Sequence, residues 1–253
     1  MTKNKIALVT GGSRGLGENM AIKLAEKGLD VLLTYRSNKE EADKTVAAVE
    51  KHGQKAYAIQ LEVADTGSFD TFVDEVKKVV NSHFGSEKID FLINNAGIGI
   101  NAMITETTEE QFDALVDIHF KGAFFLTQKM LPIMADGGGI VNISSGLARF
   151  SFPGYAVYGS LKAAMETLTK YQAKELGGRK IRSNIVAPGA IETDFGGGVN
   201  KTDEGKRTAI ASFTALGRVG LPDDIGGVVA FLCTDDAKWV NAQRIEVSGG
   251  MMI

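Results

Sequence analysis

Short apolar runs alternate with longer helical patterns along most of this 253-residue chain. Ile6–Thr10, Val31–Tyr35 and Phe91–Asn94 are such runs, with hardly a polar residue in them. Strands that lack polar alternation are typical of a parallel sheet covered on both faces. The succession of strand and helix therefore predicts an α/β fold. We expect a Rossmann-like, doubly wound parallel sheet of about seven strands, with right-handed crossovers and helices on both faces.

No repeat or linker-like stretch divides the chain, so we predict one domain over residues 1–253. From Asp194 to Gly220 the periodicity dissolves into glycines and polar residues, which predicts a substrate lid at 194–220. We expect strands at 6–10, 31–35, 56–61, 91–94, 140–143, 181–186 and 244–247. Helices are expected up to residue 27 and at 40–51, 68–80, 112–134 and 223–232, with another carrying Tyr158.

Charge and cysteine content narrow the classes of partner. Twenty-eight basic residues against 31 acidic ones give a net charge of −3, which offers no general attraction to nucleic acid or to anionic membranes. No run approaches the ~18 apolar residues of a membrane span. The N-terminal stretch reaches glycines too soon for a signal peptide. The one cysteine, Cys233, lies among apolar residues and is expected in the core. We therefore expect a cytoplasmic protein with a small-molecule substrate and no metal site.

A glycine-rich turn follows the first predicted strand directly. Thr10-Gly11-Gly12-Ser13-Arg14-Gly15-Leu16-Gly17 separates that strand from a helical pattern. Glycines let backbone N–H groups approach a pyrophosphate and place it at the N-terminus of the helix. The spacing is Gly-x-x-x-Gly-x-Gly and differs from the commonest dinucleotide fingerprint, Gly-x-Gly-x-x-Gly. The alternative is a plain tight turn, but the flanking strand and helix favour a phosphate site.

The end of the second strand bears on the choice of cofactor. NAD-binding folds usually place an acidic residue there to bind the ribose 2′-hydroxyl. Here Tyr35 is followed by Arg36 and Ser37, and no carboxylate appears until Glu40. Arg36, together with Arg14 from the glycine turn, would suit a 2′-phosphate and predicts NADP(H). Arg36 as a solvated loop residue is the alternative.

Three side chains predict carbonyl chemistry. Tyr158 and Lys162 are spaced to share one face of a helix, and Ser145 follows the predicted strand at 140–143. A nearby ammonium group favours the phenolate and would lower the pKa of Tyr158 from its usual ~10. A Tyr-x-x-x-Lys pair is common by chance, so alone it could be an amphipathic tyrosine beside a solvated lysine. In a parallel sheet, however, Ser145, the glycine turn, Arg36 and Asn95 all follow strands and meet at one edge.

Together these motifs resemble the short-chain dehydrogenase/reductase family over essentially the whole chain. The similarity rests on TGGSRGLG, NNAG at 94–97, Ser145 with YGSLK, PGAIET and the ending IEVSGGM. The resemblance implies that Tyr158 is the acid/base, that Lys162 lowers its pKa and holds the nicotinamide ribose, and that Ser145 bonds the substrate oxygen. The resemblance implies that NADP(H) is held by Gly11, Ser13, Arg14, Gly15, Leu16, Gly17, Arg36, Ser37, Glu62, Val63, Asn95, Ala96, Gly97, Tyr158, Lys162, Pro188, Gly189, Ile191 and Thr193.

Within that set, Ile191 and Thr193 would contact the carboxamide of the nicotinamide, and Asn95 would contact the adenosine-side ribose.

Two positions depart from the family pattern. Glu62 stands where an Asp usually binds the adenine, and its longer carboxylate could still reach the amino group. His119 stands where an Asn usually supports a water in the proton relay, largely through its backbone carbonyl. His119 is thus a fourth candidate catalytic position, and a packed, non-catalytic histidine is the alternative.

The predicted function is NADP(H)-dependent hydride transfer between nicotinamide and a carbonyl or alcohol substrate, as in a carbonyl reductase. A 3-oxoacyl-carrier-protein reductase is the main specific alternative. A non-catalytic NADP-sensing regulator would not need Ser145, Tyr158 and Lys162, and a purely structural subunit has no feature in its favour. The aromatic stretch Leu147–Phe152 hints at an apolar substrate. The apolar density of 112–134 and of the C-terminal stretch predicts a homotetramer.

Overall fold

The computed structural model describes residues 4–253 and contains one parallel sheet of seven strands in the order β3-β2-β1-β4-β5-β6-β7. Every neighbouring pair of strands runs parallel, as predicted for a doubly wound fold. The strands are β1 (Ile6–Val9), β2 (Asp30–Tyr35), β3 (Ala56–Gln60), β4 (Ile89–Asn94), β5 (Met134–Ile143), β6 (Arg182–Pro188) and β7 (Arg244–Val247). The predicted fold class is confirmed, and β7 has the predicted bounds.

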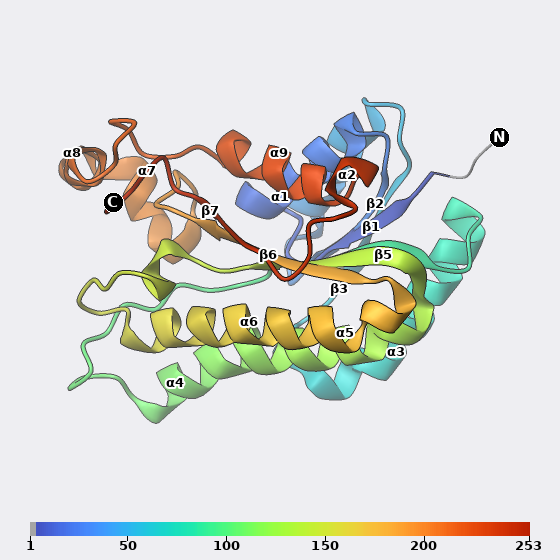
Figure 1. The fold of residues 1–253 in the computed structure, drawn as a ribbon, viewed down its shortest axis with the longest axis horizontal. Coiled ribbons are helices and arrows are strands. Elements are labelled where there is room, and N and C mark those ends of the chain that lie inside the picture. Colours follow the sequence, from blue (N-terminus) through green and yellow to red (C-terminus); the bar gives the residue numbers. More distant parts are fainter. Residues whose placement is uncertain (1–3) are drawn as a thin grey trace.

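Helices cover both faces of the sheet (Figure 1). One face carries α1 (Gly15–Glu26), α2 (Lys39–Glu50) and α9 (Pro222–Leu232). The other carries α3 (Phe69–Val79), α4 (Glu109–Val116), α5 (Ala123–Met130) and α6 (Ala156–Glu175). Two short helices, α7 (Val199–Thr202) and α8 (Glu204–Ser212), lie beyond the carboxyl ends of the strands. Among the described residues, no helix is both long enough and apolar enough to cross a membrane.

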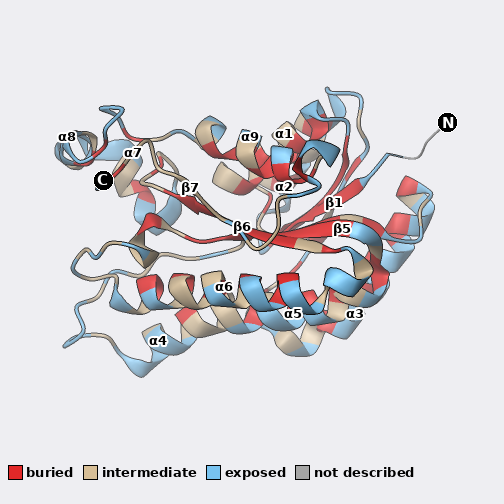
Figure 2. Ribbon diagram, in the orientation of Figure 1, coloured by how far each residue is buried: buried red, intermediate tan, exposed pale blue. Residues whose placement is uncertain are grey.

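The first strand shows why its sequence is apolar throughout. Ala7 and Val9 belong to the core on the α1 face, whereas Ile6 and Leu8 belong to the core on the α3 face. Successive side chains of a strand point to opposite faces, so a strand covered on both sides needs apolar residues at every position. Figure 2 shows the resulting buried central sheet. Each fully buried Leu or Ile contributes roughly 1.5–3 kcal/mol to stability.

The long helix predicted at 112–134 is wrong in its extent and continuity. It begins earlier, at Glu109, where a Thr108–Gln111 capping box satisfies the first backbone amides. Between α4 and α5 it becomes a π-helical turn at Asp117–Gly122, which includes His119. Met134 is already the first residue of β5. Such turns lie outside the 3.6-residue period that sequence patterns detect, and they often occur at functional sites.

The segment predicted as an irregular lid, 194–220, contains helical structure. Phe195–Gly198 form a 3₁₀ turn in which Gly196, Gly197 and Gly198 all have positive φ, and α7 and α8 follow it. The Asp203 side chain accepts a hydrogen bond from the backbone N–H of Lys206 and so caps α8. These helices bury few residues, which explains why their sequence shows little apolar periodicity.

Candidate active site

The glycine turn is shaped to receive a phosphate. Gly11 and Gly15 have φ of 63° and 60°, a region that side chains with a Cβ rarely adopt. A Cβ on Gly17 would collide with the carbonyl oxygen of Gly11, so the turn can fold tightly onto α1 only with glycine there. The N-terminus of α1 has no side-chain cap at Arg14. The Glu18 carboxylate is hydrogen-bonded to the Gly15 backbone, so the amide groups that follow Gly15 would receive an anion, and the turn fits a pyrophosphate.

Polar groups from β4 hold this turn in place. The amide of Asn95 donates to the carbonyl oxygens of Thr10 at 2.8 Å and Gly11 at 3.2 Å. The hydroxyl of Thr10 accepts hydrogen bonds from the backbone N–H groups of Asn95 and Ala96, each at 3.0 Å. The Asn95 side chain thus fixes the backbone around which a cofactor would bind, and its contact with the adenosine-side ribose stays a prediction.

Arg36 and Glu62 form an ion pair with each other at the end of β2. The sequence predicts Arg36 at the 2′-phosphate of the ribose and Glu62 at the adenine, and the structure brings the two side chains into contact. The Arg36 side chain is 71 % exposed. An ion pair this exposed is worth little, so a stronger anion such as a phosphate can compete for the guanidinium group. Ser37, which follows Arg36 directly, and Arg14, in the glycine turn, are also exposed.

The segment after β6 faces the glycine turn. Ile191 is buried and forms a bridge to Gly220, and the Thr193 methyl group lies 3.6 Å from the place that a Cβ on Gly15 would occupy. Gly189 approaches Ser248 so closely that a Cβ on Gly189 would lie 2.9 Å from the Cα atom of Ser248. Pro188 ends β6. The remaining predicted residues Ser13, Leu16, Val63, Ala96 and Gly97 belong to the glycine turn or to the loops after β3 and β4.

Tyr158 and Lys162 are both buried on α6, one turn apart. The Lys162 ammonium donates to the Ile143 carbonyl oxygen at 2.7 Å and lies 5.5 Å from the Tyr158 ring centroid. Ser145 follows β5, and its hydroxyl accepts a hydrogen bond from the Leu147 N–H at 3.2 Å. The predicted convergence of a hydroxyl, a phenol and an ammonium group is thus present.

The predicted direction of the Tyr158 pKa shift is wrong for this structure. Burial raises the pKa of Tyr158 above its usual value, and a hydrogen bond with Ser145 opposes the rise. Burial also lowers the pKa of Lys162 to about 7. In both cases burial disfavours the charged form, because that form loses its hydration. Lys162 Nζ also donates a hydrogen bond to the Ile143 carbonyl oxygen. Tyr158 is therefore held in its protonated form at neutral pH.

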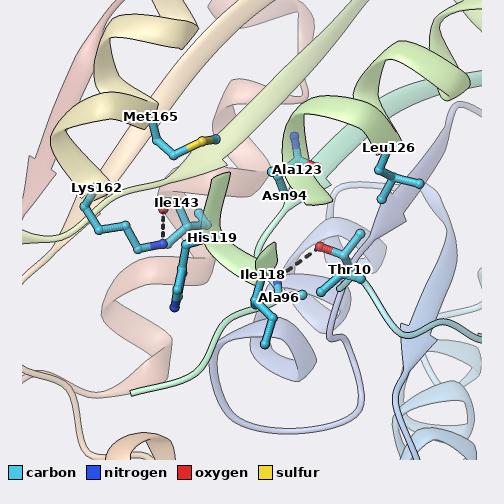
Figure 3. A pocket seen from close by; sticks show the side chains of 11 residues that line it. Thr10, Asn94, Ala96, Ile118, His119, Ala123, Leu126, Ile143, Lys162 and Met165 are labelled. Carbon is cyan, nitrogen blue, oxygen red and sulfur yellow. Dashed lines mark hydrogen bonds between the residues drawn. The ribbon is translucent and has the colours of Figure 1, made fainter. Parts of the chain in front are cut away.

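Next to Lys162 lies a small space, here called the inner cavity. Its volume is about 10 Å³, close to that needed for one water molecule. His119 Nδ1 and Asn94 Oδ1 are buried without a hydrogen-bond partner among residues 4–253. Figure 3 shows the side chains around it. It is lined by Thr10, Val63, Asn94, Ala96, Ile118, His119, Ala123, Leu126, Ile143, Lys162 and Met165.

His119 packs closely against Tyr158 in this region. The two rings meet edge to face with 5.1 Å between centroids, and a Cβ on Gly97 would lie 2.7 Å from His119 Cε1. The His119 Nε2 atom lies 2.7 Å from the Ile98 carbonyl oxygen. Burial, followed by the nearby charge of Lys162, lowers the pKa of His119 to about 3. The imidazole is therefore neutral between pH 5 and 8.

A larger space, here called the outer cavity, opens on the other side of Ser145. Its volume is about 550 Å³, within the range of small-molecule sites. Phe195, in the segment after β6, lies against Tyr158, with 5.9 Å between ring centroids. The outer cavity is lined by Asn101, Ser145, Gly146, Leu147, Phe150, Phe152, Pro153, Tyr155, Pro188, Gly189, Ala190, Gly196, Val199, Asn200, Lys206, Ala209, Ile210, Phe213 and Met251.

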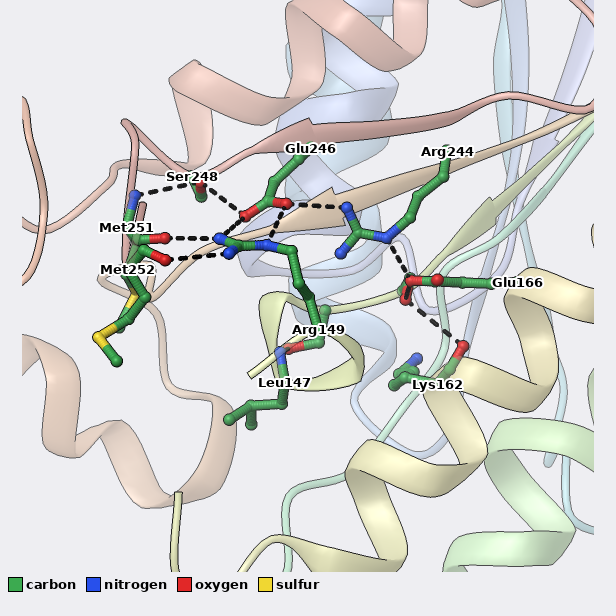
Figure 4. A network of polar contacts seen from close by, with 11 residues as sticks. Leu147, Arg149, Lys162, Glu166, Arg244, Glu246, Ser248, Met251 and Met252 are labelled. Carbon is green, nitrogen blue, oxygen red and sulfur yellow. Dashed lines mark hydrogen bonds and ion pairs between the residues drawn. The ribbon is translucent and has the colours of Figure 1, made fainter. Parts of the chain in front are cut away.

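An ion network ties the loop after Ser145 to the C-terminal residues (Figure 4). Arg149 binds both carboxylate oxygens of Glu246 and donates to the carbonyl oxygens of Met251 and Met252. Burial tends to raise the pKa of Glu246, but hydrogen bonds from Arg149 and Arg244 outweigh it and lower the pKa to about 2. The network therefore stays charged at neutral pH and fixes the Met251 wall of the outer cavity.

Arg244 extends this network toward α6. Its Nε atom donates to Glu166 at 2.7 Å, and the same carboxylate accepts a hydrogen bond from Ser144 at 2.6 Å. Sequence reasoning missed these residues and also Asn101, Lys206, Phe213 and Met251 in the outer cavity. The partners are far apart in the chain, and only the aromatic stretch near Phe150 gave a local signal.

Comparison with known proteins gives consistent matches. A family model described as enoyl-(acyl carrier protein) reductase matches residues 11–252. The 3-oxoacyl-[acyl-carrier-protein] reductase FabG of Staphylococcus aureus is 40% identical over 256 residues and covers 99% of both chains. Among solved structures, the promiscuous reductase LugOII superposes with a TM-score of 0.93 at 36% identity, covering 99% of both chains. The angucycline C-6 ketoreductase LanV, solved with bound NADP, has a TM-score of 0.92 at 34% identity and covers 98% of this chain and 95% of its own.

Proposed function

Because this chain belongs to the short-chain dehydrogenase/reductase family, we propose that it reduces a ketone with NADPH, using Tyr158 as the proton donor. At the level of the family, it is an NADP(H)-dependent oxidoreductase that acts on a carbonyl or alcohol group. The observation that carries the proposal is the meeting of Ser145, Tyr158 and Lys162 between a phosphate-shaped glycine turn and a cavity of about 550 Å³.

The residues around the glycine turn suit NADP(H). The left-handed Gly11 and Gly15 and the uncapped N-terminus of α1 would hold the pyrophosphate, and Arg36 and Arg14 would bind the 2′-phosphate. Glu62 would turn from Arg36 toward the adenine. Ile191 and Thr193 would line the nicotinamide end. When bound, NADP(H) supplies or accepts the hydride that moves to or from the carbonyl carbon.

The proton step falls to the three side chains. Ser145 Oγ donates a hydrogen bond to the carbonyl oxygen, and Tyr158 Oη gives that oxygen its proton. The raised pKa of Tyr158 keeps this proton in place at neutral pH until the carbonyl oxygen gains negative charge. The ammonium of Lys162 then stabilises the phenolate and holds the ribose hydroxyls. The His119 imidazole stays neutral and transfers no proton in this scheme. Its backbone carbonyl would support the relay water.

Two finer features belong to this proposal. A homotetramer is supported by exposed aromatic side chains on the α4–α5 segment, where Phe112 and Phe125 are 48% and 40% exposed, and near the C-terminus, where Trp239 is 97% exposed. A cytoplasmic location is supported by the single free cysteine, Cys233, which is fully buried. Burial raises its pKa to about 12, so it is unreactive as expected.

Reduction of a 3-oxoacyl group on a carrier protein is the second candidate. The observation in its favour is the 40% identity to the S. aureus reductase over essentially the whole chain. The aromatic walls of the outer cavity instead favour a ring-bearing ketone, which matches the substrate class named for LanV.

The test is NADPH consumption with a panel of carbonyl compounds that includes aliphatic ketones, fused-ring aromatic ketones and 3-oxoacyl thioesters. We expect turnover of fused-ring ketones to exceed that of the thioesters. Faster turnover of the thioesters would favour the carrier-protein reductase. No turnover of any carbonyl by a protein that binds NADPH would contradict the proposed function.

A further inference from the structure

The outer cavity contains one charged side chain among aromatic walls. Lys206 of α8 is half-buried and is the only charged residue among the described residues that line it. The same cavity is lined by Phe150, Phe152 and Phe213, whose rings follow one another with centroids 5.6 and 6.2 Å apart. A cation at the rim of an otherwise uncharged cavity would be stabilised by an anion from the ligand.

Neighbouring cations of the lid are already paired, and Lys206 is not. Lys201 binds Asp194 at 3.2 Å, and Arg207 binds Glu192 at 2.8 Å. The Lys206 ammonium has no hydrogen-bond or ion-pair partner among residues 4–253, although Asp203 accepts from its backbone N–H. The lining includes no carboxylate. The unpaired charge of Lys206 therefore borders the outer cavity, whose lining supplies no counter-ion.

We propose that the substrate of this enzyme is an aromatic ketone that also carries a carboxylate, and that Lys206 binds this carboxylate. The inference rests on the proposed function and adds the substrate class. The ketone oxygen would lie at Ser145, at one end of the outer cavity, while the aromatic body would lie against Phe150, Phe152 and Phe213. The anion would then orient the ring system and select one face of the ketone for hydride.

The test compares acids with their esters. A set of 1-tetralones bearing a carboxylate at each free ring position, and the methyl ester of each, are assayed with NADPH. The proteins are wild type, Lys206→Met, Lys206→Arg and the control Lys201→Met, which removes a lid cation outside the outer cavity. For at least one ring position we expect kcat/KM of the acid to exceed that of the ester about tenfold, the value of one charge-assisted hydrogen bond.

In Lys206→Met this acid-to-ester ratio should fall to near one, and Lys206→Arg should retain most of it. The Lys201→Met control should keep the wild-type ratio. Calorimetry with the unreactive pair 2-naphthoate and 2-naphthamide gives a second readout that needs no turnover. Tighter binding of naphthoate than of naphthamide, lost in Lys206→Met, supports the inference.

The outcomes separate the two proposals. Equal turnover of every acid and its ester by wild type would overturn the inference and leave the proposed reductase function standing. An acid preference that survives in Lys206→Met would also overturn it. Lys206-dependent binding of naphthoate without reduction of any tetralone would support the anion site and count against ketone reduction. If wild type shows neither a binding preference for naphthoate nor turnover of any tetralone, the inference is overturned.

Discussion

The inner and outer cavities lie on opposite sides of the reacting residues and are built in opposite ways. The inner cavity is about 10 Å³, lies between the sheet and the helices of one face, and is lined by buried polar groups such as Lys162 and Asn94. The outer cavity is about 550 Å³ and is walled by aromatic rings from the loop before α6 and from Phe213 after α8, with Met251 added from the C-terminal residues. The first belongs to the core, and the second to segments that the core merely supports.

This difference separates chemistry from recognition. Groups near the inner cavity are fixed by hydrogen bonds such as that of Lys162 to the Ile143 carbonyl at 2.7 Å, so they can serve any carbonyl in the same way. Groups of the outer cavity meet only the part of the substrate that differs between compounds. Changes near the inner cavity should therefore alter turnover of all substrates alike, and changes in the outer cavity should alter their ranking.

Tyr158→Phe should give the largest effect and should affect every carbonyl equally. It removes the proton donor, and such groups typically contribute about 10²–10⁴-fold to the rate. Fluorescence titration should show that NADPH still binds. Tyr171→Phe, on an exposed position of the same helix, is the matched control. A Tyr158→Phe enzyme that keeps more than about a tenth of the wild-type rate would refute the assigned role.

Arg36→Asp should reverse the cofactor preference while leaving the ranking of carbonyl substrates unchanged. A guanidinium–phosphate hydrogen bond is worth about 1.5–3 kcal/mol, so wild type should prefer NADPH by at least about tenfold. In the variant the new carboxylate repels the 2′-phosphate and can accept from a 2′-hydroxyl. The ratio of kcat/KM for the two cofactors measures this, with Lys44→Asp on α2 as control. Equal values for both cofactors in wild type would contradict it.

Phe213→Ala tests the outer cavity. An aromatic contact contributes about 0.5–1.5 kcal/mol, so KM for a fused-ring ketone should rise about two- to tenfold, and KM for acetone-sized ketones should change little. Phe231→Ala on α9, similarly exposed but outside the cavity, is the control. A uniform fall in kcat for all ketones would show that the two sides of the site are not separable in this way.

His119→Asn should have the smallest effect on rate. With a pKa of about 3, the imidazole does not titrate near neutrality. Any inflection of kcat/KM near pH 7 should instead come from Lys162, whose pKa is about 7, and should persist in the variant. An inflection that disappears in His119→Asn would make the imidazole part of the proton path.

The same substitution has a consequence for stability. An unfolded histidine binds a proton below about pH 6.5, whereas buried His119 resists protonation until about pH 3. The wild type therefore loses stability as the pH falls from 6.5 toward 3, because the unfolded chain binds more protons there. The decrease in Tm between pH 7 and pH 5 should be smaller in His119→Asn. An equal decrease would contradict the buried, neutral assignment.

Much of the fold and the inner side of the site could be read from the sequence. Ile6–Val9 is apolar because both its faces are buried, and Ser145, Tyr158 and Lys162 carry local spacing that survives in the structure. The π-helical turn at His119 has no such signature, because it interrupts a pattern that otherwise continues as helix. The direction of the Tyr158 pKa shift was missed because burial, which spacing does not reveal, outweighs the hydrogen bond with Ser145.

The outer cavity was less predictable for a related reason. Arg149 and Glu246 are brought together only by the complete sheet, and Lys206 belongs to a helix that buries too little to leave a periodic pattern. The aromatic residues near Phe150 were visible, but their ring contacts with Phe213 depend on tertiary structure.

The hydrogen bonds from Arg149 to the carbonyl oxygens of Met251 and Met252 affect where an affinity tag can be attached. Met251 is part of the outer cavity wall, and the side chain of Ile253 is 93% exposed just beyond it. An affinity tag fused after Ile253 would start beside the outer cavity, whereas β1 begins at the opposite, amino end of the strands (Figure 1). Amino-terminal fusions are therefore the appropriate preparations for comparing substrates.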